Sequence, residues 1–316
     1  MKKRIIIDGD MGSDDYIAIH LAILSKKFKI EGFSLVYGNA SMDNVKNNLF
    51  KCLDDIGYKD KFKIYEGESH PIKDLGYNRK DNAFGSDGLG DVSYDKVYGI
   101  IEPINSIDWM IDTVNKNPNK ISIVALGPLT NIAKAIEKDK SFANNIKELI
   151  VMGGSEGFGN ITPYAEFNFY NDPYAVKTVY SAGIKSIVNI GWNIAVKVPI
   201  TKEYEDLLKD SKDKNANFIY DITRKTAEID KEYGGAIISD PITICYLLDR
   251  TCISFKDAKM NIEIIDMDKI SQTIFDYNDP ANCKNAVDLD KRKIYKIIFG
   301  TLFKKDKKKL KELLRR

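Results

Sequence analysis

The sequence has few of the residues on which several common protein chemistries depend. Its four cysteines are scattered and form no Cys-x-x-Cys pair, which argues against a structural zinc site or a redox dithiol. Only two histidines, His20 and His70, occur in 316 residues, and neither lies in a recognisable motif. Unpaired cysteines suit a reducing compartment, so we expect the protein to be cytoplasmic.

Strong net charge and long hydrophobic runs are absent as well. The chain has 48 lysines and arginines against 46 aspartates and glutamates, a net charge of +2, which offers no strong field for nucleic acid or an anionic membrane. The apolar run near the N-terminus, Ile5–Ile7, is far too short for a signal peptide or a membrane span. We therefore expect neither nucleic acid nor a membrane among its partners.

The chain does contain enough apolar residues for a sizeable core, at 43% of the composition. Short β-branched runs end in turns rich in Gly, Asp and Asn, and helical patterns follow these turns. This alternation predicts an α/β fold with a mostly parallel, open, Rossmann-like central sheet flanked by helices. The predicted strands are Arg4–Asp8, Phe33–Tyr37, Lys63–Tyr65, Ile121–Leu126, Glu148–Met152 and Ser186–Ile190.

After residue 200 the pattern becomes mainly helical. An antiparallel pair of strands is predicted at Met260–Asp266 and Gln272–Phe275. Because no linker separates the two halves, we expect one domain over residues 1–316, with an α/β core at 1–200 and a helical C-terminal cap at 201–316 packed on it. The predicted helices of this cap are Glu203–Leu208, Asn215–Asp230, Pro241–Leu248 and Lys291–Leu314.

The strongest local signal is the run Ile-Ile-Ile-Asp8-Gly-Asp10-Met-Gly-Ser-Asp14-Asp15. It follows a predicted strand, and ligands of parallel sheets bind beyond the carboxyl ends of strands. Four carboxylates within eight residues repel one another unless a hard divalent cation lies among them. Two other readings remain open at this point: a solvated, N-capped loop, and a phosphotransferase that uses Asp8 as its nucleophile.

Two further stretches carry polar groups in irregular segments. Asn160, Glu166 and Asn168 lie in one loop, and their amides and carboxylate are the partners that vicinal sugar hydroxyls need, although the loop could simply cap the sheet. Asp240 precedes Pro241 at the start of a helical run, where it could be a plain N-cap.

Together these stretches closely resemble the inosine-uridine nucleoside hydrolase family, and the resemblance covers nearly the whole chain. Six matching segments in one order are far more specific than one aspartate-rich loop. They are Asp8-x-Asp10-x-x-x-Asp14-Asp15, Tyr37-Gly38-Asn39, Asp87-Gly88-Leu89-Gly90, Gly127-Pro128-Leu129-Thr130-Asn131, Met152-Gly153-Gly154 and the loop Asn160–Asp172.

The resemblance implies calcium-dependent hydrolysis of the N-glycosidic bond of a ribonucleoside, with Asp10 accepting a proton from a Ca²⁺-bound water. It also implies a homodimer or homotetramer. The residues it assigns to Ca²⁺ are Asp10, Asp15, the backbone carbonyl of Leu126, and Asp240, with Asp8 just behind them. Those it assigns to the ribose are Asp14, Asn39, Asn160, Glu166 and Asn168, with Met152 lining the sugar pocket.

The sequence departs from the family where the base leaves. Ser239 and Phe84 stand where the family has histidines, so the imidazole that protonates the base is missing. We expect either that Tyr233 donates the proton or that Phe84 and Trp192 stack on the base, although both rings could equally be core. A ribose- or nucleoside-binding protein with weak or no catalysis is the alternative function.

Overall fold

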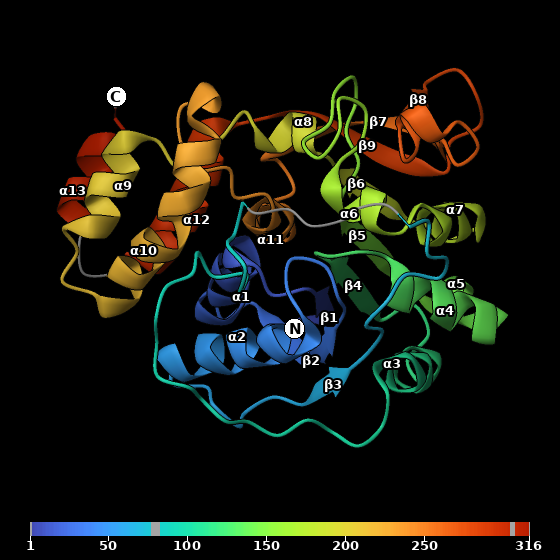
Figure 1. Cartoon of the computed structure of the whole chain (residues 1–316), viewed down its shortest axis with the longest axis horizontal. Helices are drawn as coiled ribbons and strands as arrows, with labels where there is room; N and C mark the ends of the chain where they lie inside the picture. Colours follow the sequence, from blue (N-terminus) through green and yellow to red (C-terminus); the bar gives the residue numbers. More distant parts are fainter. Residues whose placement is uncertain (1, 77–82, 304–306, 316) are drawn as a thin grey trace.

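The computed structural model describes residues 2–76, 83–303 and 307–315, and its centre is a nine-stranded sheet (Figure 1). The strand order is β3-β2-β1-β4-β5-β6-β9-β7-β8. Neighbouring strands from β3 to β9 pair in parallel, whereas β7 runs antiparallel to both β9 and β8. The strands are β1 (Lys3–Gly9), β2 (Phe28–Leu35), β3 (Ile64–Glu66), β4 (Ile121–Ala125), β5 (Glu148–Met152), β6 (Ile187–Ile190), β7 (Ile253–Ile262), β8 (Thr273–Asp276) and β9 (Cys283–Leu289).

Helices cover both faces of this sheet. The longer ones are α1 (Ser13–Leu24), α2 (Met42–Asp55), α3 (Ser106–Asn115), α4 (Thr130–Lys138), α7 (Pro173–Ser181), α9 (Lys202–Lys209), α10 (Lys214–Ile229), α11 (Asp240–Leu248) and α12 (Lys291–Leu302). The shorter ones are α5 (Lys140–Asn145), α6 (Phe167–Asn171), α8 (Trp192–Ala195), α13 (Lys307–Leu313) and two 3₁₀ turns, Lys231–Tyr233 and Met267–Lys269. In the part of the chain that the structure describes, no helix is long and apolar enough to cross a membrane.

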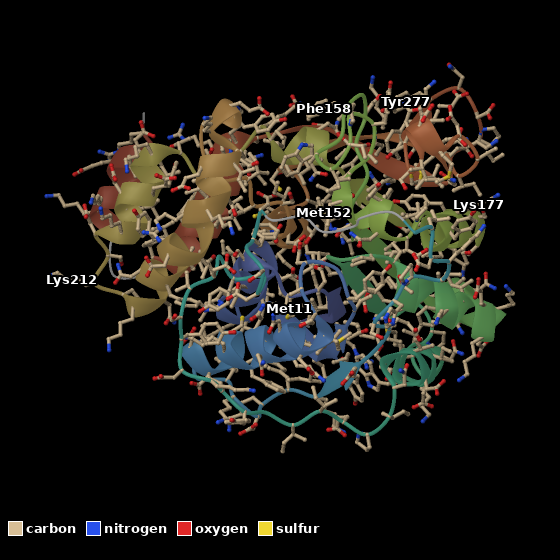
Figure 2. The ribbon with its side chains drawn as sticks, viewed as in Figure 1. Met11, Met152, Phe158, Lys177, Lys212 and Tyr277 are labelled. Carbon is tan, nitrogen blue, oxygen red and sulfur yellow. The ribbon has the colours of Figure 1, made fainter. Side chains whose placement is uncertain are left out.

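The run of three isoleucines in β1 explains why the sheet is covered on both sides. Successive side chains of a strand point to opposite faces. Ile5 and Ile7 pack into the core beneath α1, α2 and α11, whereas Ile6 packs into a second core beneath α3, α4 and α7. Figure 2 shows Met11 and Met152 inside the molecule and Lys177 at its surface.

The predicted α/β architecture is confirmed, and all six strands predicted before residue 200 are present. The antiparallel pair is present as β7 and β8, but β7 begins seven residues earlier than predicted, at Ile253 rather than Met260. One helix was predicted over Lys291–Leu314, and the structure has α12 and α13 there, with residues 304–306 outside the described part.

The mainly helical description of residues 201–316 omitted a strand that joins the two halves. β9 pairs in parallel with β6, so the C-terminal half contributes to the same sheet. Its sequence, CKNAVDL, gives a weak hydrophobic signal because Lys284 and Asn285 interrupt the apolar residues. The amide of Asn285 is buried and accepts a hydrogen bond from Asn189 Nδ2 on β6, at 3.2 Å. Because a polar residue of this strand is paired inside the sheet, the strand lacks the continuous apolar run by which the others were predicted.

Candidate active site

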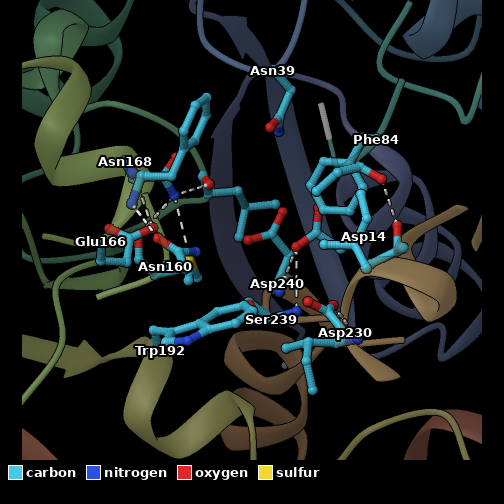
Figure 3. Close-up of a pocket in the computed structure, with 17 residues that line it drawn as sticks. Asp14, Asn39, Phe84, Asn160, Glu166, Asn168, Trp192, Asp230, Ser239 and Asp240 are labelled. Atoms are coloured by element: carbon cyan, nitrogen blue, oxygen red, sulfur yellow. Dashed lines mark hydrogen bonds between the residues drawn. The ribbon is translucent and has the colours of Figure 1, made fainter. Parts of the chain in front are cut away.

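One cavity lies at the carboxyl ends of the central strands, beside the first turns of α1 and α11 (Figure 3). It encloses about 590 Å³, including its open mouth. Its walls come from both halves of the chain. The lining residues are Asp14, Asn39, Ala83, Phe84, Leu126, Met152, Asn160, Glu166, Phe167, Asn168, Trp192, Thr226, Ile229, Asp230, Ile237, Ser239 and Asp240.

Three buried carboxylates meet on one side of this cavity. Asp14 and Asp15 begin α1, Asp240 begins α11, and one oxygen from each lies within 4.8 Å of the others. Oδ2 of Asp14 accepts hydrogen bonds from the backbone N–H groups of Ser239 and Asp240, at 3.2 and 3.4 Å. Two helix N-termini therefore direct their positive ends at the cluster, which reduces the cost of burying its charge.

The carboxylates of the cluster are buried close together, and a bound cation would offset their mutual repulsion. Burial raises the pKa of Asp14 to about 6, and burial together with the charge of Asp14 raises the pKa of Asp15 to about 7. Among the described residues, three aspartate oxygens are buried without a hydrogen-bond partner: Asp15 Oδ1 and Asp240 Oδ1 in the cluster, and Oδ2 of the neighbouring Asp8. Buried carboxylate oxygens are normally paired or coordinate metals. The residues present therefore fit a hard divalent cation.

Asp10 lies against this cluster, beside Asp15, and Asn39 binds both of its carboxylate oxygens. Asn39 donates its backbone N–H to Asp10 Oδ2 at 2.8 Å and its side-chain Nδ2 to Oδ1 at 3.0 Å. Burial, and next the charge of Asp15, raise the pKa of Asp10 well above its ordinary value. A β-carbon at Gly38 would lie 1.9 Å from Asp10 Oδ2, so only glycine allows this close approach. Asn39 thus fixes the orientation of the Asp10 carboxylate.

Asp8 lies behind the cavity and does not line it. Its side chain is fully buried, and its Oδ1 accepts hydrogen bonds from Ser34 Oγ and from Asn131 Nδ2, the latter at 2.8 Å. Burial raises its pKa to about 6. Ser34 and Asn131 hold Asp8 on the far side of the acidic cluster's neighbour Asp10, and this position gives no support to the aspartyl-phosphate interpretation.

The loop after β5 supplies the polar wall opposite the acidic cluster. Glu166 caps α6 and accepts backbone N–H groups from Asn168, Gly154 and Phe169, which partly offset the burial that raises its pKa to about 7. Asn168 Nδ2 donates to the carbonyl oxygens of Leu126, at 2.8 Å, and Met152, at 3.2 Å. The Asn168 amide therefore joins the ends of β4 and β5 at the cavity wall.

The same loop is tied to β8 and to the residue that follows it. Ser155 donates its backbone N–H to Thr273 Oγ1 on β8 at 3.1 Å, and Tyr277 donates its hydroxyl to Glu156 at 2.8 Å. Asn160 accepts the backbone N–H of Phe167 at 2.9 Å. These bonds hold the loop in the conformation that brings Asn160 to the cavity.

The predicted base-facing residues occupy different places. Phe84 and Trp192 line the cavity, as does Ser239, whereas Tyr233 does not (Figure 3). The Tyr233 ring meets Trp192 edge to face, with centroids 6.0 Å apart. Burial and the charge of Glu232 raise the pKa of the Tyr233 phenol, although the Trp192 indole counteracts this. The cavity therefore brings together every predicted substrate-binding residue and the predicted metal ligands Leu126 and Asp240. Three predicted residues do not line it: Asp10, Asp15 and Tyr233.

Four cavity residues at the end of α10 and just beyond it were absent from the sequence interpretation: Thr226, Ile229, Asp230 and Ile237. Ile229 and Asp230 lie three and four residues after Thr226, a spacing that places them near Thr226 on one side of the helix. The spacing of these residues before the Gly234-Gly235 turn is the signal in the sequence that could identify them.

Comparison with known proteins agrees with this geometry. Residues 5–296 match the family model described as inosine-uridine preferring nucleoside hydrolase. A probable uridine nucleosidase of Oryza sativa subsp. japonica is 33% identical over 267 residues, which are 83% of this chain and 79% of that protein.

Solved structures give the same result. A plant nucleoside hydrolase has a TM-score of 0.88 and 27% identity, covering 96% of this chain and 99% of its own. A purine-preferring ribonucleoside hydrolase from Gardnerella vaginalis has a TM-score of 0.86 and 24% identity, covering 99% of each chain, and at that identity it supports the fold alone. The chain therefore belongs to the inosine-uridine preferring nucleoside hydrolase family, glycosidases that split ribonucleosides into ribose and free base.

Proposed function

We propose that this nucleoside hydrolase acts with a bound Ca²⁺ and that Asp10 is the base that activates the attacking water. The observation that carries this proposal is the pair of buried, unpartnered oxygens on Asp15 and Asp240 beside Asp10, among the described residues. The residues proposed to hold the cation are Asp10, Asp15, the carbonyl of Leu126, and Asp240. When bound, a divalent cation would lower the pKa of a coordinated water and offset the clustered negative charge.

Asp10 is suited to accept the proton of that water. Its carboxylate is fixed at both oxygens by Asn39, so its direction does not depend on substrate. General bases act best when their pKa lies near the working pH, and burial moves the pKa of Asp10 upward from its ordinary value.

The remaining polar residues are proposed to grip the ribose. Asp14, Asn39, Asn160, Glu166 and Asn168 offer carboxylate and amide groups on facing walls of the cavity, while Met152 packs against the sugar. As the bond to the base lengthens, the ribosyl group gains positive charge. The surrounding carboxylates favour this charge because they are already oriented by backbone N–H groups.

Departure of the base is proposed to depend on stacking rather than on imidazole. Phe84 and Trp192 line the cavity and can pack against a flat base. Tyr233 is a weaker candidate for the acid than the sequence alone indicated, because Trp192 lies beside it, its pKa is raised, and it does not line the cavity.

The direct test is release of ribose from a panel of purine and pyrimidine nucleosides by the purified protein. We expect activity with Ca²⁺, its loss in EDTA, and its return when Ca²⁺ is added in excess. Full activity in EDTA would contradict the metal requirement. Nucleoside binding without ribose release at full metal occupancy would instead favour the binding-protein alternative.

We also propose that residues 1–316 form one domain and that the protein is a cytoplasmic homodimer or homotetramer. The parallel pairing of β6 with β9 supports the single domain, because it joins the two halves in one sheet. Light scattering on the purified protein measures the assembly, and a monomer at micromolar concentration would contradict it.

A further inference from the structure

The positive charge of the chain is concentrated at its C-terminal end. Residues 291–316 contain twelve lysines and arginines against two acidic residues, so residues 1–290 are net acidic. The expectation that nucleic acid is not a partner rests on the net charge of +2 for the whole chain, which conceals this separation. A protein of balanced total charge can carry a strong local field where its cations gather.

The helices that carry this charge pack together at one end of the molecule. Figure 1 shows α13 beside α9 with α12 next to them, and α13 packs against both helices. The apolar side chains of α13 face the protein, since Leu310 is buried in the core and Leu313 and Leu314 pack against it. The lysines and arginines of α12 and α13 therefore form an outer surface.

Two adjoining basic grooves lie along this surface and share Arg292, Leu314 and Arg315. They enclose about 950 and 1000 Å³ including their open mouths, against about 590 Å³ for the active-site cavity. Two connected open grooves suit an extended ligand better than a small one. The cationic residues that line them are Lys291, Arg292, Lys293, Lys296, Lys311 and Arg315, and the acidic ones are Glu203 and Asp290.

Most of the cations in these grooves are not neutralised within the chain. Lys293 lies 3.8 Å from Asp290, and on the same face Lys309 pairs with Asp210 at 3.0 Å. Like charges that are kept together without counter-charges repel one another, and a bound polyanion would relieve this repulsion. The exposed residues without an ion pair to any described residue are Arg292, Lys296, Lys311 and Arg315.

Two other partners suit this surface less well. A symmetric dimer interface buries the same patch of both subunits, so it would place these cations against their own copies. An anionic membrane attracts cations, but helices that bind membranes also insert apolar side chains, and those of α13 pack against the protein. The remaining class of partner is a flexible polyanion in solution.

We propose that the basic grooves along α12 and α13 bind the phosphodiester backbone of single-stranded RNA. Lysine and arginine side chains bind phosphates without reading sequence, and charge complementarity supplies most of such binding. Tyr295 lines one groove and offers an aromatic ring that a base can contact. Hydrolysis and dephosphorylation of RNA yield ribonucleosides, so this surface would place the enzyme where its substrates are released.

The test is fluorescence anisotropy of a labelled oligouridylate titrated with the full-length protein at several salt concentrations. Four phosphate contacts predict that Kd rises by roughly 50-fold when the salt concentration increases from about 50 to about 200 mM. The grooves share no residue with the active-site cavity, so the bound oligonucleotide should leave ribose release from nucleosides unchanged.

The decisive variant combines Lys296→Gln with Lys311→Gln. Removal of two contacts should weaken RNA binding by about tenfold or more at low salt and reduce the salt dependence of Kd to roughly sevenfold. The matched control combines Lys59→Gln with Lys61→Gln, two exposed lysines outside these grooves. It has the same total charge as the decisive variant, and it should bind RNA as the wild type does.

Three results would overturn the proposal. The first is a Kd for RNA weaker than about 10⁻⁴ M at physiological salt, the lower limit of ordinary non-specific binding. The second is equal weakening by the decisive and control variants, which would show that only total charge matters. The third is tighter binding to polyglutamate or to vesicles rich in phosphatidylserine, which would identify an acidic protein or a membrane as the partner.

Discussion

The two ends of the cavity are lined by different kinds of side chain, polar at one end and mostly apolar at the other. At the proposed sugar end, carboxylates and amides such as Glu166 and Asn168 are buried and fixed by hydrogen bonds to neighbouring groups. At the other end, side chains such as Ile229, which is 51% exposed, form an apolar wall beside the mouth. We therefore expect the proposed sugar end to be a rigid site for the ribose that all ribonucleosides share, and the other end to tolerate changes of side chain without disturbing that site.

This comparison leads to a general expectation for variants. Changes at the sugar end should affect all nucleosides equally, since every substrate shares the ribose. Changes at the apolar end should alter the ratio between bases while leaving the chemistry of the sugar intact. The predictions below test this division, from the largest expected effect to the smallest.

The largest effect is expected for Asp10→Asn. The amide cannot accept the proton of the attacking water, so kcat should fall by about 10²–10⁴-fold for every nucleoside that the wild type cleaves. Steady-state kinetics on one purine and one pyrimidine substrate measure this loss. A fall confined to one base would contradict the division, and Asp54→Asn, at an exposed site on α2, is the control.

Asn168→Ala should be next in size. It leaves the carbonyl oxygens of Leu126 and Met152 without their side-chain donor, which should cost about 1–3 kcal/mol in the free energy of unfolding. Urea denaturation measures this cost. KM should also rise, by the same factor for nucleosides of every base. Unchanged stability would show that water replaces the amide, and the sugar end would then be less rigid than the comparison states.

Thermal unfolding of the metal-free protein should depend on pH in a defined direction. Burial raises the pKa values of Asp8 and Asp14 to about 6 and those of Asp15 and Glu166 to about 7. The folded state therefore binds these protons more tightly than the unfolded state, so stability is greatest near pH 4 and falls as pH rises through 6 and 7.

Calcium should reverse this trend, because it binds the ionised carboxylates. We expect Tm in EDTA to drop by several degrees between pH 4 and pH 8, and the gain in Tm from Ca²⁺ to be largest above pH 7. Differential scanning fluorimetry measures both series. A Tm in EDTA that rises over this range would show that other groups dominate the acidic cluster.

The smallest effect is expected for Ile229→Ser at the apolar end. Loss of one half-exposed side chain removes up to about 1 kcal/mol of contact with the base, or about fivefold in KM. Tm should stay unchanged because the side chain is largely in solvent. Ile265→Ser, at a site that is 86% exposed and outside the cavity, is the control and should alter neither quantity.

The sequence predicted the sugar end far better than the base end. Asp10, Asp14 and Asp15 are close together in the chain and follow an apolar strand, so their proximity at the end of that strand could be predicted. Asp230 could not be found in this way, because its place on the cavity wall depends on a turn that returns Ile237 to the end of α10. Local patterns predict groups that act within one segment, and tertiary contacts decide the rest.

The dependence on tertiary contacts also explains which strands could be predicted from the sequence. β1 and β4 are continuous apolar runs because both faces of each strand are covered, and this pattern is readable from sequence. β9 is as buried at Cys283 and Ala286, but its Asn285 is satisfied by Asn189 from a strand almost a hundred residues earlier. An asparagine such as Asn285 is compatible with a buried strand only because a partner such as Asn189 hydrogen-bonds to it.

The position of β9 also bears on how the molecule is made. Until residues 283–289 have left the ribosome, β6 has an open edge of unpaired backbone groups, and such edges are templates for association between chains. A protein truncated after α11 would contain every proposed calcium ligand, yet it would expose that edge. We expect the truncated protein to aggregate during synthesis. Pairing of β9 with β6 would then be the step that keeps the whole chain soluble.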